Sequence, residues 1–134
     1  MLNTLCVIAL ALVAMPMAEA KKDINSRKWK NRLLVASVSD TESDLYETTK
    51  SFVEDNECDM ADRSMKTIYF VDGQNNLYDT PGFVNGEGLW LVGFDGGKKK
   101  SSDDAELLDE LFDLIDAMPM RKDQLRARDN KAVC

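Results

Sequence analysis

The sequence predicts an α/β fold built around a four-stranded mixed sheet, and three observations lead to this prediction. Two nearly continuous apolar runs, residues 32–38 and 65–71, flank a stretch with helical periodicity. A third apolar run, residues 89–94, leads directly into an Asp-Gly turn. A strongly amphipathic stretch, residues 103–118, follows. Apolar runs of this length are typical of buried strands, and recurrence at three- and four-residue steps is typical of helices.

The first half of the chain is expected to form a β-α-β unit. The runs "RLLVASV" and "MKTIYFV" do not alternate with polar residues, which is typical of strands covered on both faces. Between them, Ser39 and Glu42 have the spacing of a capping box, which predicts a helix running to about Asp55. Cys58 is expected in the loop after this helix. A helix between two buried strands implies a right-handed parallel crossover.

The second half is expected to form a β-hairpin. A long, turn-rich segment, residues 72–88, comes first and is expected to be a surface loop. After the third strand, Asp95, Gly96 and Gly97 supply a tight turn, so the next strand must return antiparallel. The lysines of that fourth strand, residues 98–101, are interpreted as protection of an exposed sheet edge, with an anion-binding patch as the alternative.

The stretch "LIDAMPMRKDQ" is interpreted as a docked helix stop rather than a catalytic or ligand-binding site. Pro119 disfavours helical geometry at Met118 and has no amide hydrogen to donate, so the preceding helix must end or kink there. Proline is also favoured in the first turn of a new helix. Asp116 and Arg121 are placed to pair across the bend. Met118 and Met120 are expected to fill irregular gaps beneath the corner.

The N-terminus has the pattern of a secretory leader. An apolar stretch is followed by Ala18 and Ala20, the spacing of a signal-peptidase site, so residues 1–20 are expected to be a signal peptide cleaved after Ala20. The apolar stretch is shorter than the about 20 residues that span a bilayer, and an uncleaved anchor is the alternative. We therefore expect a secreted or periplasmic protein with no membrane span after cleavage.

The remaining chain is long enough for one domain. We expect a basic N-terminal arm at residues 21–28, one domain at residues 29–125 and a C-terminal tail at residues 126–134. The arm is interpreted as a solvated leader, with contact to an anionic lipid or an acidic partner as the alternative. The net charge of −7 argues against nucleic-acid binding, which depends chiefly on positive charge.

The residue types needed for many kinds of catalysis are absent from this sequence. The chain has no histidine, which excludes Ser-His-Asp and Cys-His nucleophiles and His-containing zinc sites. No Cys-x-x-Cys pair occurs. After cleavage, which removes Cys6, only Cys58 and Cys134 remain. They can form an intramolecular disulfide, a covalent dimer or free thiols, and the sequence leaves these open. We predict no catalytic residue, no metal site and no cofactor.

The order of elements is thioredoxin-like: β-α-β, then a β-hairpin and a C-terminal helix, without the helix that joins the two halves of thioredoxins. Neither the redox cysteine pair nor the proline before the third strand is present. The stretches "WKNRLLVASVSD", "LVGFDGGKKK" and "LFDLIDAMPMR" together resemble the domain of unknown function 4174 family. That resemblance implies a thioredoxin-like fold and an extracytoplasmic location, in secreted bacterial proteins and in vertebrate matrix proteins of the sushi-repeat and coiled-coil-domain-containing kinds. It supplies no catalytic residues, and the chain departs from the family pattern at Lys99 and Lys100.

Three hypotheses of function follow. The first is an exported, non-catalytic thioredoxin-like module that binds a protein or glycan in the cell envelope or extracellular space, through an apolar patch around Tyr78, Phe83 and Trp90. The second is a single-cysteine redox protein that uses Cys58, which requires an exposed thiol with a lowered pKa. The third is a hydrolase with paired carboxylates, although no spacing singles out two of them. The oligomeric state is left open.

Overall fold

The structure is a computed structural model that describes residues 20–131 and 133–134. Apart from Ala20, the predicted signal peptide with its Cys6 lies outside the described residues. None of the helices in the described part of the chain has the length and apolar character needed to cross a bilayer. In chain order, the elements are η1 (Ile24–Arg27), β1 (Arg32–Val38), α1 (Asp44–Asp55), α2 (Glu57–Asp62), β2 (Met65–Val71), β3 (Gly88–Val92), β4 (Lys98–Ser102), α3 (Glu106–Asp116) and α4 (Pro119–Ala127).

The four strands form one mixed sheet in the order β2-β1-β3-β4. β1 and β2 run parallel, and β3 is antiparallel both to β1 and to β4. In this register, Val35 in the centre of the sheet lies between Ile68 on one side and Trp90 on the other. The predicted parallel β-α-β unit and the antiparallel hairpin are both present. The α/β, thioredoxin-like fold with a four-stranded mixed sheet is thereby confirmed.

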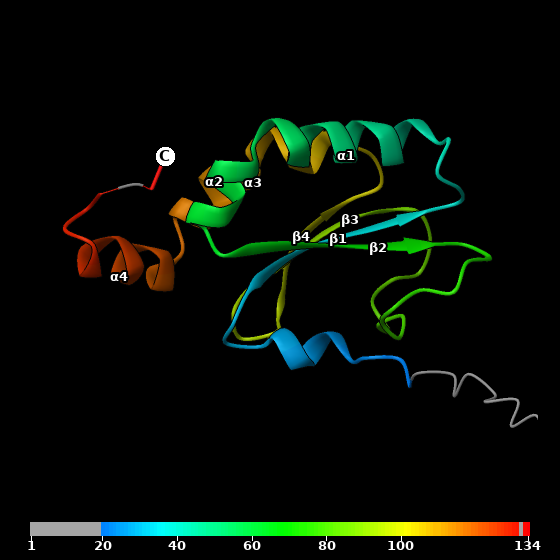
Figure 1. Ribbon diagram of the computed structural model, residues 1–134, viewed down its shortest axis with the longest axis horizontal. Coiled ribbons are helices and arrows are strands. Elements are labelled where there is room, and N and C mark those ends of the chain that lie inside the picture. The colour runs from blue at the N-terminus through cyan, green and yellow to red at the C-terminus, as the bar shows by residue number, and fades with distance from the viewer. Residues whose placement is uncertain (1–19, 132) are drawn as a thin grey trace, which may run out of the picture.

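One face of the sheet is covered by α1 and α3 (Figure 1). The first core cluster lies between them, and its buried sheet residues are Leu34, Ala36, Leu89 and Leu91. α3 contributes Leu107, Leu108, Leu111 and Ile115, which follow the predicted helical spacing. The face of α1 that lies toward the sheet also has helical spacing: Thr49 is buried, and Leu45, Phe52 and Val53 pack against this cluster.

The opposite face of the sheet is covered by η1 and by the irregular segment between β2 and β3 rather than by a long helix (Figure 1). Ile24 from η1 and Tyr78 from the segment pack on the sheet, where they contact the cluster that contains Val35 and Trp90. An apolar sheet face needs a cover, because exposing it to water costs free energy in proportion to its area. In this reduced fold the irregular segment and the N-terminal arm provide that cover.

The N-terminal arm therefore differs from the solvated leader that we expected. Ile24 is only 6% exposed, and Lys22 forms a bridge with Tyr78. The Lys22 N–H donates to the carbonyl oxygen of Leu77 at 3.0 Å, and the Asp79 N–H donates to that of Lys22 at 2.8 Å. The physical reason is Ile24, which can leave water only by packing on the bare sheet face. The arm is thus part of the domain.

Two local expectations for the first half were wrong. The N-cap of α1 is Ser43, whose hydroxyl accepts the Tyr46 N–H at 3.2 Å. The capping box at Ser39 does not form, because the Ser39 N–H donates to Glu87 instead. Cys58 lies in the short helix α2 and not in a loop.

The helix stop at Pro119 is confirmed. α3 ends at Asp116, Met118 has extended backbone angles, and Pro119 occupies the first turn of α4. Arg121 Nε donates to Asp116 Oδ1 at 3.1 Å, which is the predicted pair across the bend. Met118 packs against the first core cluster as expected. Met120 does not fill a gap under the corner, because it is 45% exposed on the first turn of α4.

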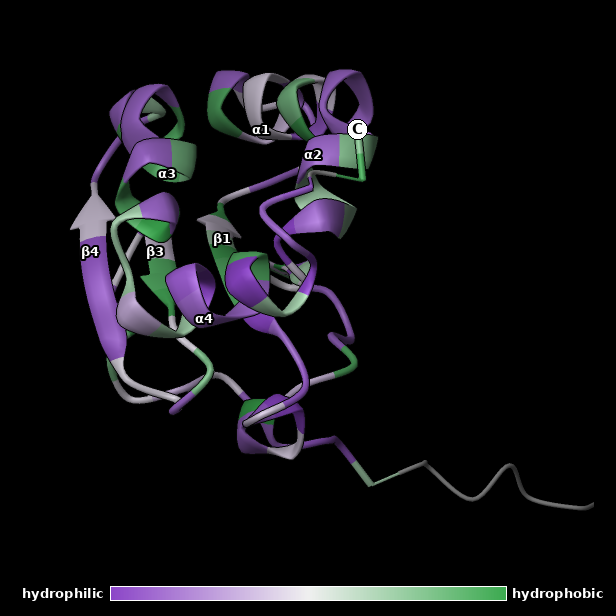
Figure 2. Ribbon diagram, turned by 90° about the vertical axis from the view of Figure 1, so that its left-hand side faces the viewer, coloured by the Kyte–Doolittle hydropathy of each residue, from purple (hydrophilic) through white to green (hydrophobic). Residues whose placement is uncertain are grey.

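The outer strand β4 has the character of a protected edge. It is hydrophilic over most of its length (Figure 2), and its three lysines are exposed. Lys99 pairs with Asp95 at 2.8 Å and Lys100 with Glu110 at 3.3 Å. The preceding turn forms as predicted: Gly96 has a φ of 79°, and the Gly97 N–H donates to Asp95 Oδ1 at 2.9 Å.

Candidate functional site

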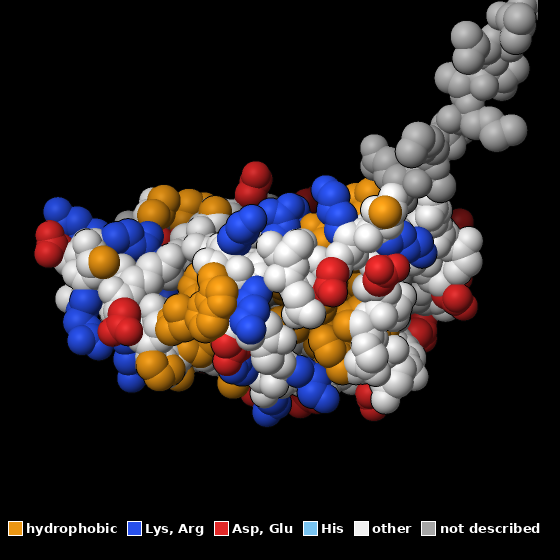
Figure 3. All heavy atoms as spheres, turned by 90° about the horizontal axis from the view of Figure 1, so that it is seen from below, with side chains coloured by type: hydrophobic (Ala, Val, Ile, Leu, Met, Phe, Trp, Pro, Cys, Tyr) orange, Lys and Arg blue, Asp and Glu red, His pale blue; other side chains and the backbone are white. Residues whose placement is uncertain are grey.

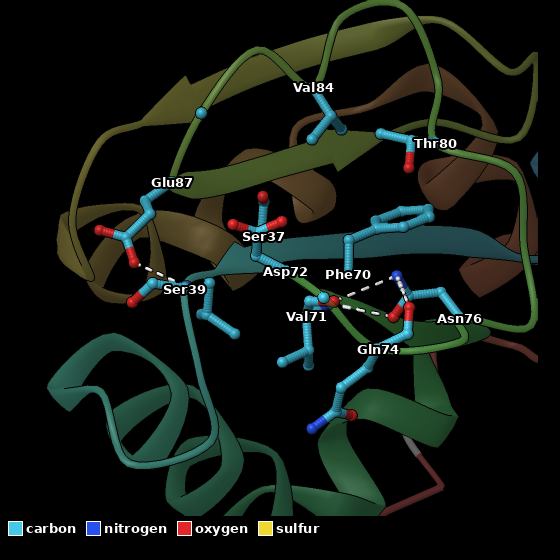
Figure 4. A pocket seen from close by; sticks show the side chains of 13 residues that line it. Ser37, Ser39, Phe70, Val71, Asp72, Gln74, Asn76, Thr80, Val84 and Glu87 are labelled. Atoms are coloured by element: carbon cyan, nitrogen blue, oxygen red, sulfur yellow. Dashed lines mark hydrogen bonds between the residues drawn. The ribbon is translucent and has the colours of Figure 1, made fainter.

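A groove of about 500 Å³ lies at the carboxyl ends of β1 and β2. Its walls are the ends of these strands, Ser37 to Ser39 and Phe70 to Asp72, and part of the segment that leads to β3 (Figure 4). Gly88, the first residue of β3, pairs with Ser37, so the segment before β3 reaches the same edge. Open α/β sheets bind ligands at the carboxyl ends of their parallel strands. This groove, which we call the carboxyl-end groove, is therefore the leading candidate site.

The carboxyl-end groove has a mixed lining, with similar shares of polar and apolar surface. Val84 is its partly exposed apolar side chain, whereas Phe70 is buried beside it (Figure 4). The polar side chains are hydroxyls, carboxamides and carboxylates, which together offer both donors and acceptors. They are Ser37, Ser39, Asp72, Gln74, Asn76, Thr80 and Glu87.

The side chain of Asn76 joins the groove wall to the end of β2 by hydrogen bonds. Its Oδ1 accepts the Val71 N–H at 3.0 Å, and its Nδ2 donates to the carbonyl oxygens of Val71 and Gln74, both at 3.3 Å (Figure 4). The Gln74 N–H also returns to the carbonyl oxygen of Val71, across a turn in which Gly73 has a φ of 73°. These bonds satisfy the last backbone groups of β2 and hold the polar turn at the mouth of the groove.

Glu87 links the other wall to the end of β1. The Ser39 N–H donates to Glu87 Oε1 at 2.7 Å (Figure 4). The side chain and the N–H of Ser39 lower the pKa of Glu87, so this carboxylate is an acceptor and not a proton donor at neutral pH. Thioredoxins carry their redox cysteines directly after the first strand, but residues 40–55, from the end of β1 to the end of α1, contain no cysteine. The described residues of the groove can therefore form hydrogen bonds but carry no thiol or imidazole nucleophile.

The apolar patch that we expected around Tyr78, Phe83 and Trp90 is not an exposed surface. Trp90 is 5% exposed and Tyr78 6% exposed, and both belong to the second core cluster. Phe83 is half-buried and packs on Trp90, with 6.0 Å between the ring centroids. The physical reason is that these rings provide the cover of the second sheet face. Figure 3 shows that face: hydrophobic side chains appear in separate patches among polar and basic ones.

Cys58 and Cys134 form a disulfide, with their Cα atoms 5.9 Å apart. Of the three arrangements that the sequence leaves open, the structure has the intramolecular one. The bridge joins α2 to the last residue of the chain, at the amino ends of β1 and β2 and far from the carboxyl-end groove (Figures 1 and 2). Because Cys58 has no free thiol in this arrangement, the single-cysteine redox hypothesis lacks its nucleophile.

A buried network of arginines and aspartates lies beside the disulfide, and sequence reasoning found only one of its pairs. Asp62, which is buried, accepts hydrogen bonds from Arg121, from Arg128 and from the Val133 N–H. Burial raises the pKa of Asp62, but these hydrogen bonds outweigh burial and hold it far below its usual range. The C-terminal segment, expected as a tail, is thus tied to the domain. The missed contacts of Asp62 join residues 59 or more positions apart, and no local sequence pattern predicts them.

The second carboxylate of this network is Asp116. Arg63 donates to both of its oxygens, from Nε and from Nη2, at 3.0 Å each, and Arg121 donates to it as well. Burial raises the pKa of Asp116, but hydrogen bonds from the two arginines outweigh burial and lower it. Buried Asp62 and partly exposed Asp116 are therefore both ionised and paired with guanidinium groups. They do not provide the neutral acid that the paired-carboxylate hydrolase requires.

The family model described as Domain of unknown function (DUF4174) matches residues 23–82 and 83–124. The matched residues begin just before η1 and end within α4, so they include both ends of the sheet. Searches of the curated proteins and of the solved structures gave no match to this chain. Because the family model covers most of the sequence, the chain belongs to the family described as Domain of unknown function (DUF4174).

Proposed function

We propose that this protein is an exported, non-catalytic binding module that takes a neutral glycan in the carboxyl-end groove. The observation that carries the proposal is the groove itself: hydroxyl, carboxamide and carboxylate side chains share its lining with apolar surface, at the end of the sheet where α/β proteins bind ligands. Its volume of about 500 Å³ lies within the about 300–1,000 Å³ usual for small-ligand sites. Export rests on the leader pattern of residues 1–20.

The chemistry of the lining favours a sugar over other ligand classes. Each sugar hydroxyl both donates and accepts, and the groove offers partners of both kinds, such as Gln74 and Thr80. Val84, which is partly exposed, can pack against the C–H face of a sugar ring. Asp72 and Glu87 disfavour anionic ligands, because a like charge in a partly enclosed site is repelled. A strongly apolar partner would leave these polar groups without hydrogen bonds.

A binding experiment with a matched pair of variants tests this proposal. The intact protein, with its disulfide formed, is screened on an array of neutral and acidic glycans, and hits are measured by isothermal titration calorimetry. Gln74→Ala removes an exposed carboxamide of the groove. Ser101→Ala, on the exposed outer strand β4, is the control.

We expect neutral glycans to bind, Gln74→Ala to weaken them about fivefold or more by loss of a hydrogen bond, and Ser101→Ala to leave them unchanged. No binding of any glycan, or equal binding by both variants, would overturn the proposal. Capture of a peptide in place of a glycan would replace the ligand class.

A further inference from the structure

A second, smaller pocket of about 240 Å³ lies between the amino end of β1, the turn that joins β3 to β4 and the corner between α3 and α4. We call it the Arg32 pocket, and the residues of its wall that matter here are Arg32, Phe94, Lys99, Met118, Pro119 and Met120. Arg32 opens β1, Phe94 follows β3, and the Met-Pro-Met triplet joins α3 to α4. Each of the three sequence stretches that resemble the family contributes to this wall.

Arg32 is an unusual residue to find in this wall, because its side chain is 0% exposed and only partly hydrogen-bonded. Nη1 donates to the carbonyl oxygen of Arg63 at 2.8 Å and to Gln124 at 3.4 Å. The guanidinium carbon lies 4.0 Å from the centre of the Phe94 ring. Nε and Nη2 have no hydrogen-bond partner among the described residues. Leaving buried donors unpaired is costly, more so when the group is charged.

The two unpartnered nitrogens, Nε and Nη2, are the pair through which an arginine can hydrogen-bond to both oxygens of a carboxylate. Nε–H and Nη2–H of an arginine point the same way and form a fork that matches the two oxygens of a carboxylate. The same protein shows this match in use, since Arg63 holds Asp116 through Nε and Nη2 at 3.0 Å each. In Arg32 the corresponding two nitrogens, Nε and Nη2, have no hydrogen-bond partner among the described residues.

No carboxylate of the buried network is available to Arg32. Asp62 is taken by Arg121 and Arg128, and Asp116 by Arg63 and Arg121. Burial and the nearby charge of Arg121 lower the pKa of Arg32 to about 10, against the opposing effect of Asp116. The charge of Arg32 is therefore present at neutral pH but incompletely balanced.

One further feature of the wall, the start of α4, favours a negative group. α4 begins beside the pocket, and Met118, its N-cap, makes no side-chain hydrogen bond to the free N–H groups of the first turn. The start of a helix carries partial positive charge. Lys99 also lines the pocket, together with Asp95, but these two are paired with each other at 2.8 Å. Arg32 and the start of α4 thus make the electrostatic potential of the pocket positive, which favours a negatively charged ligand.

We infer that the Arg32 pocket binds a small carboxylate with an apolar body, whose carboxylate pairs with Nε and Nη2 of Arg32 and whose body packs on Met118 and Met120. Methionine side chains are flexible and apolar, so they adapt to such a body. This site lies at the opposite end of the sheet from the carboxyl-end groove. It does not depend on the glycan proposal, and either can fail without the other.

Hexanoate is the probe, with hexanamide as its uncharged counterpart. Binding to the intact protein, with its disulfide formed, is measured by calorimetry at constant ionic strength, and the Arg32 Nε–H resonance is followed by NMR. We expect hexanoate to bind and to shift this resonance, and hexanamide to do neither. Equal binding of the two compounds, or binding that leaves the Arg32 resonance unmoved, would overturn the inference.

Two variants and one control locate the site. Arg32→Met replaces the buried charge by an apolar side chain of similar length and should weaken hexanoate at least about tenfold. Arg126→Met makes the same change of net charge at an exposed residue paired with Asp123, and should leave binding unchanged. Retained binding in Arg32→Met would contradict the proposal.

Met120→Glu keeps the inference testable if Arg32→Met fails to fold. Met120 is exposed in the first turn of α4, where an acidic residue is favourable to the helix. The new carboxylate should repel hexanoate or occupy the Arg32 fork itself, so binding should be lost while the fold is kept. Undiminished binding in this variant would mean that hexanoate sits elsewhere and would overturn the inference.

Discussion

The two ends of the sheet use polar residues in opposite ways. At the carboxyl ends of β1 and β2, the hydroxyls, carboxamides and carboxylates line a groove of about 500 Å³. At the amino ends, arginines pair with aspartates near α2, α4 and the disulfide, and the pair of Arg121 with Asp62 is buried. The polar groups of the first end line the groove in which we propose ligand binding, whereas those of the second end pair with one another.

This difference has a physical basis in burial. An exposed ion pair contributes little, because water already stabilises both charges. A buried one must be complete, since removing one partner leaves a charge in a poor solvent. The amino end is therefore sensitive to substitution, whereas the carboxyl end is free to be specialised for binding. Arg32 is the exception at the amino end, because part of its hydrogen-bonding capacity is unused.

The largest expected effect is loss of the disulfide at the amino end. The double substitution of Cys58→Ser and Cys134→Ser releases a loop of 76 residues and should lower the free energy of unfolding by about 4 kcal/mol. Urea unfolding of the intact and substituted proteins measures this. A change below about 1 kcal/mol would show that the Asp62 contacts alone hold the C-terminal segment, because a bridge of this span normally contributes more.

Asp62→Asn should have the next largest effect, about 3 kcal/mol at pH 7, because it removes the buried carboxylate of the pair and leaves buried Arg121 with Asp116 alone. Asp123→Asn is the matched control, since the exposed pair of Asp123 with Arg126 should contribute at most about 1 kcal/mol. Thermal and urea unfolding of both variants provide the measurement. Equal losses in the two variants would remove the distinction between the buried and the exposed pair.

Comparison of the original protein with Asp62→Asn should also show a pH dependence of stability. The pKa of Asp62 is lowered by folding, so its contribution is present above the pKa of the unfolded chain, about 3.9, and is lost as the pH falls toward the lower folded value. The difference in stability between the original protein and Asp62→Asn should therefore shrink below about pH 4. A difference that stays constant from pH 7 to pH 2 would contradict this assignment.

The smallest effect is expected at the carboxyl-end groove. Asn76→Ala removes the side chain that holds the turn after β2 and should cost about 1 to 2 kcal/mol, as for a few partly exposed hydrogen bonds. Hydrogen exchange should quicken at Val71, whose N–H loses its partner, while the amides around Arg32 are unaffected. Faster exchange at both ends would show that the two ends of the sheet open together.

Local patterns predicted much of the fold. The apolar run of β1 and the period of α3 depend only on neighbouring residues, and both elements formed where they were expected. Pro119 ended α3 because its effect acts on the residue before it. The pair of Asp116 and Arg121 was also predictable, since its members are five positions apart. Ser39 shows the limit of such patterns. The predicted capping box does not form, and the Ser39 N–H donates instead to Glu87, 48 positions away.

The second sheet face could not be predicted in the same way. Tyr78 and Trp90 stand in stretches that are compatible with either an exposed patch or a core. Which of these applies depends on whether another segment covers them, and here Ile24 and the segment after β2 do so. The carboxyl-end groove is a consequence of that covering path, so its residues carried no local signal either.

The sequence alone determined the order of the four strands with α1 and α3, the turn at Gly96, the break at Pro119 and the lack of histidine, because each follows from residue type and short spacing. Three features were decided only by the tertiary structure. Cys58 forms a disulfide with Cys134, and Asp62 pairs with two arginines. Arg32 is buried, and its Nε and Nη2 have no hydrogen-bond partner among the described residues. Those outcomes depend on which distant segments cover each end of the sheet. That choice is made by the burial of the whole chain and not by any one stretch of it.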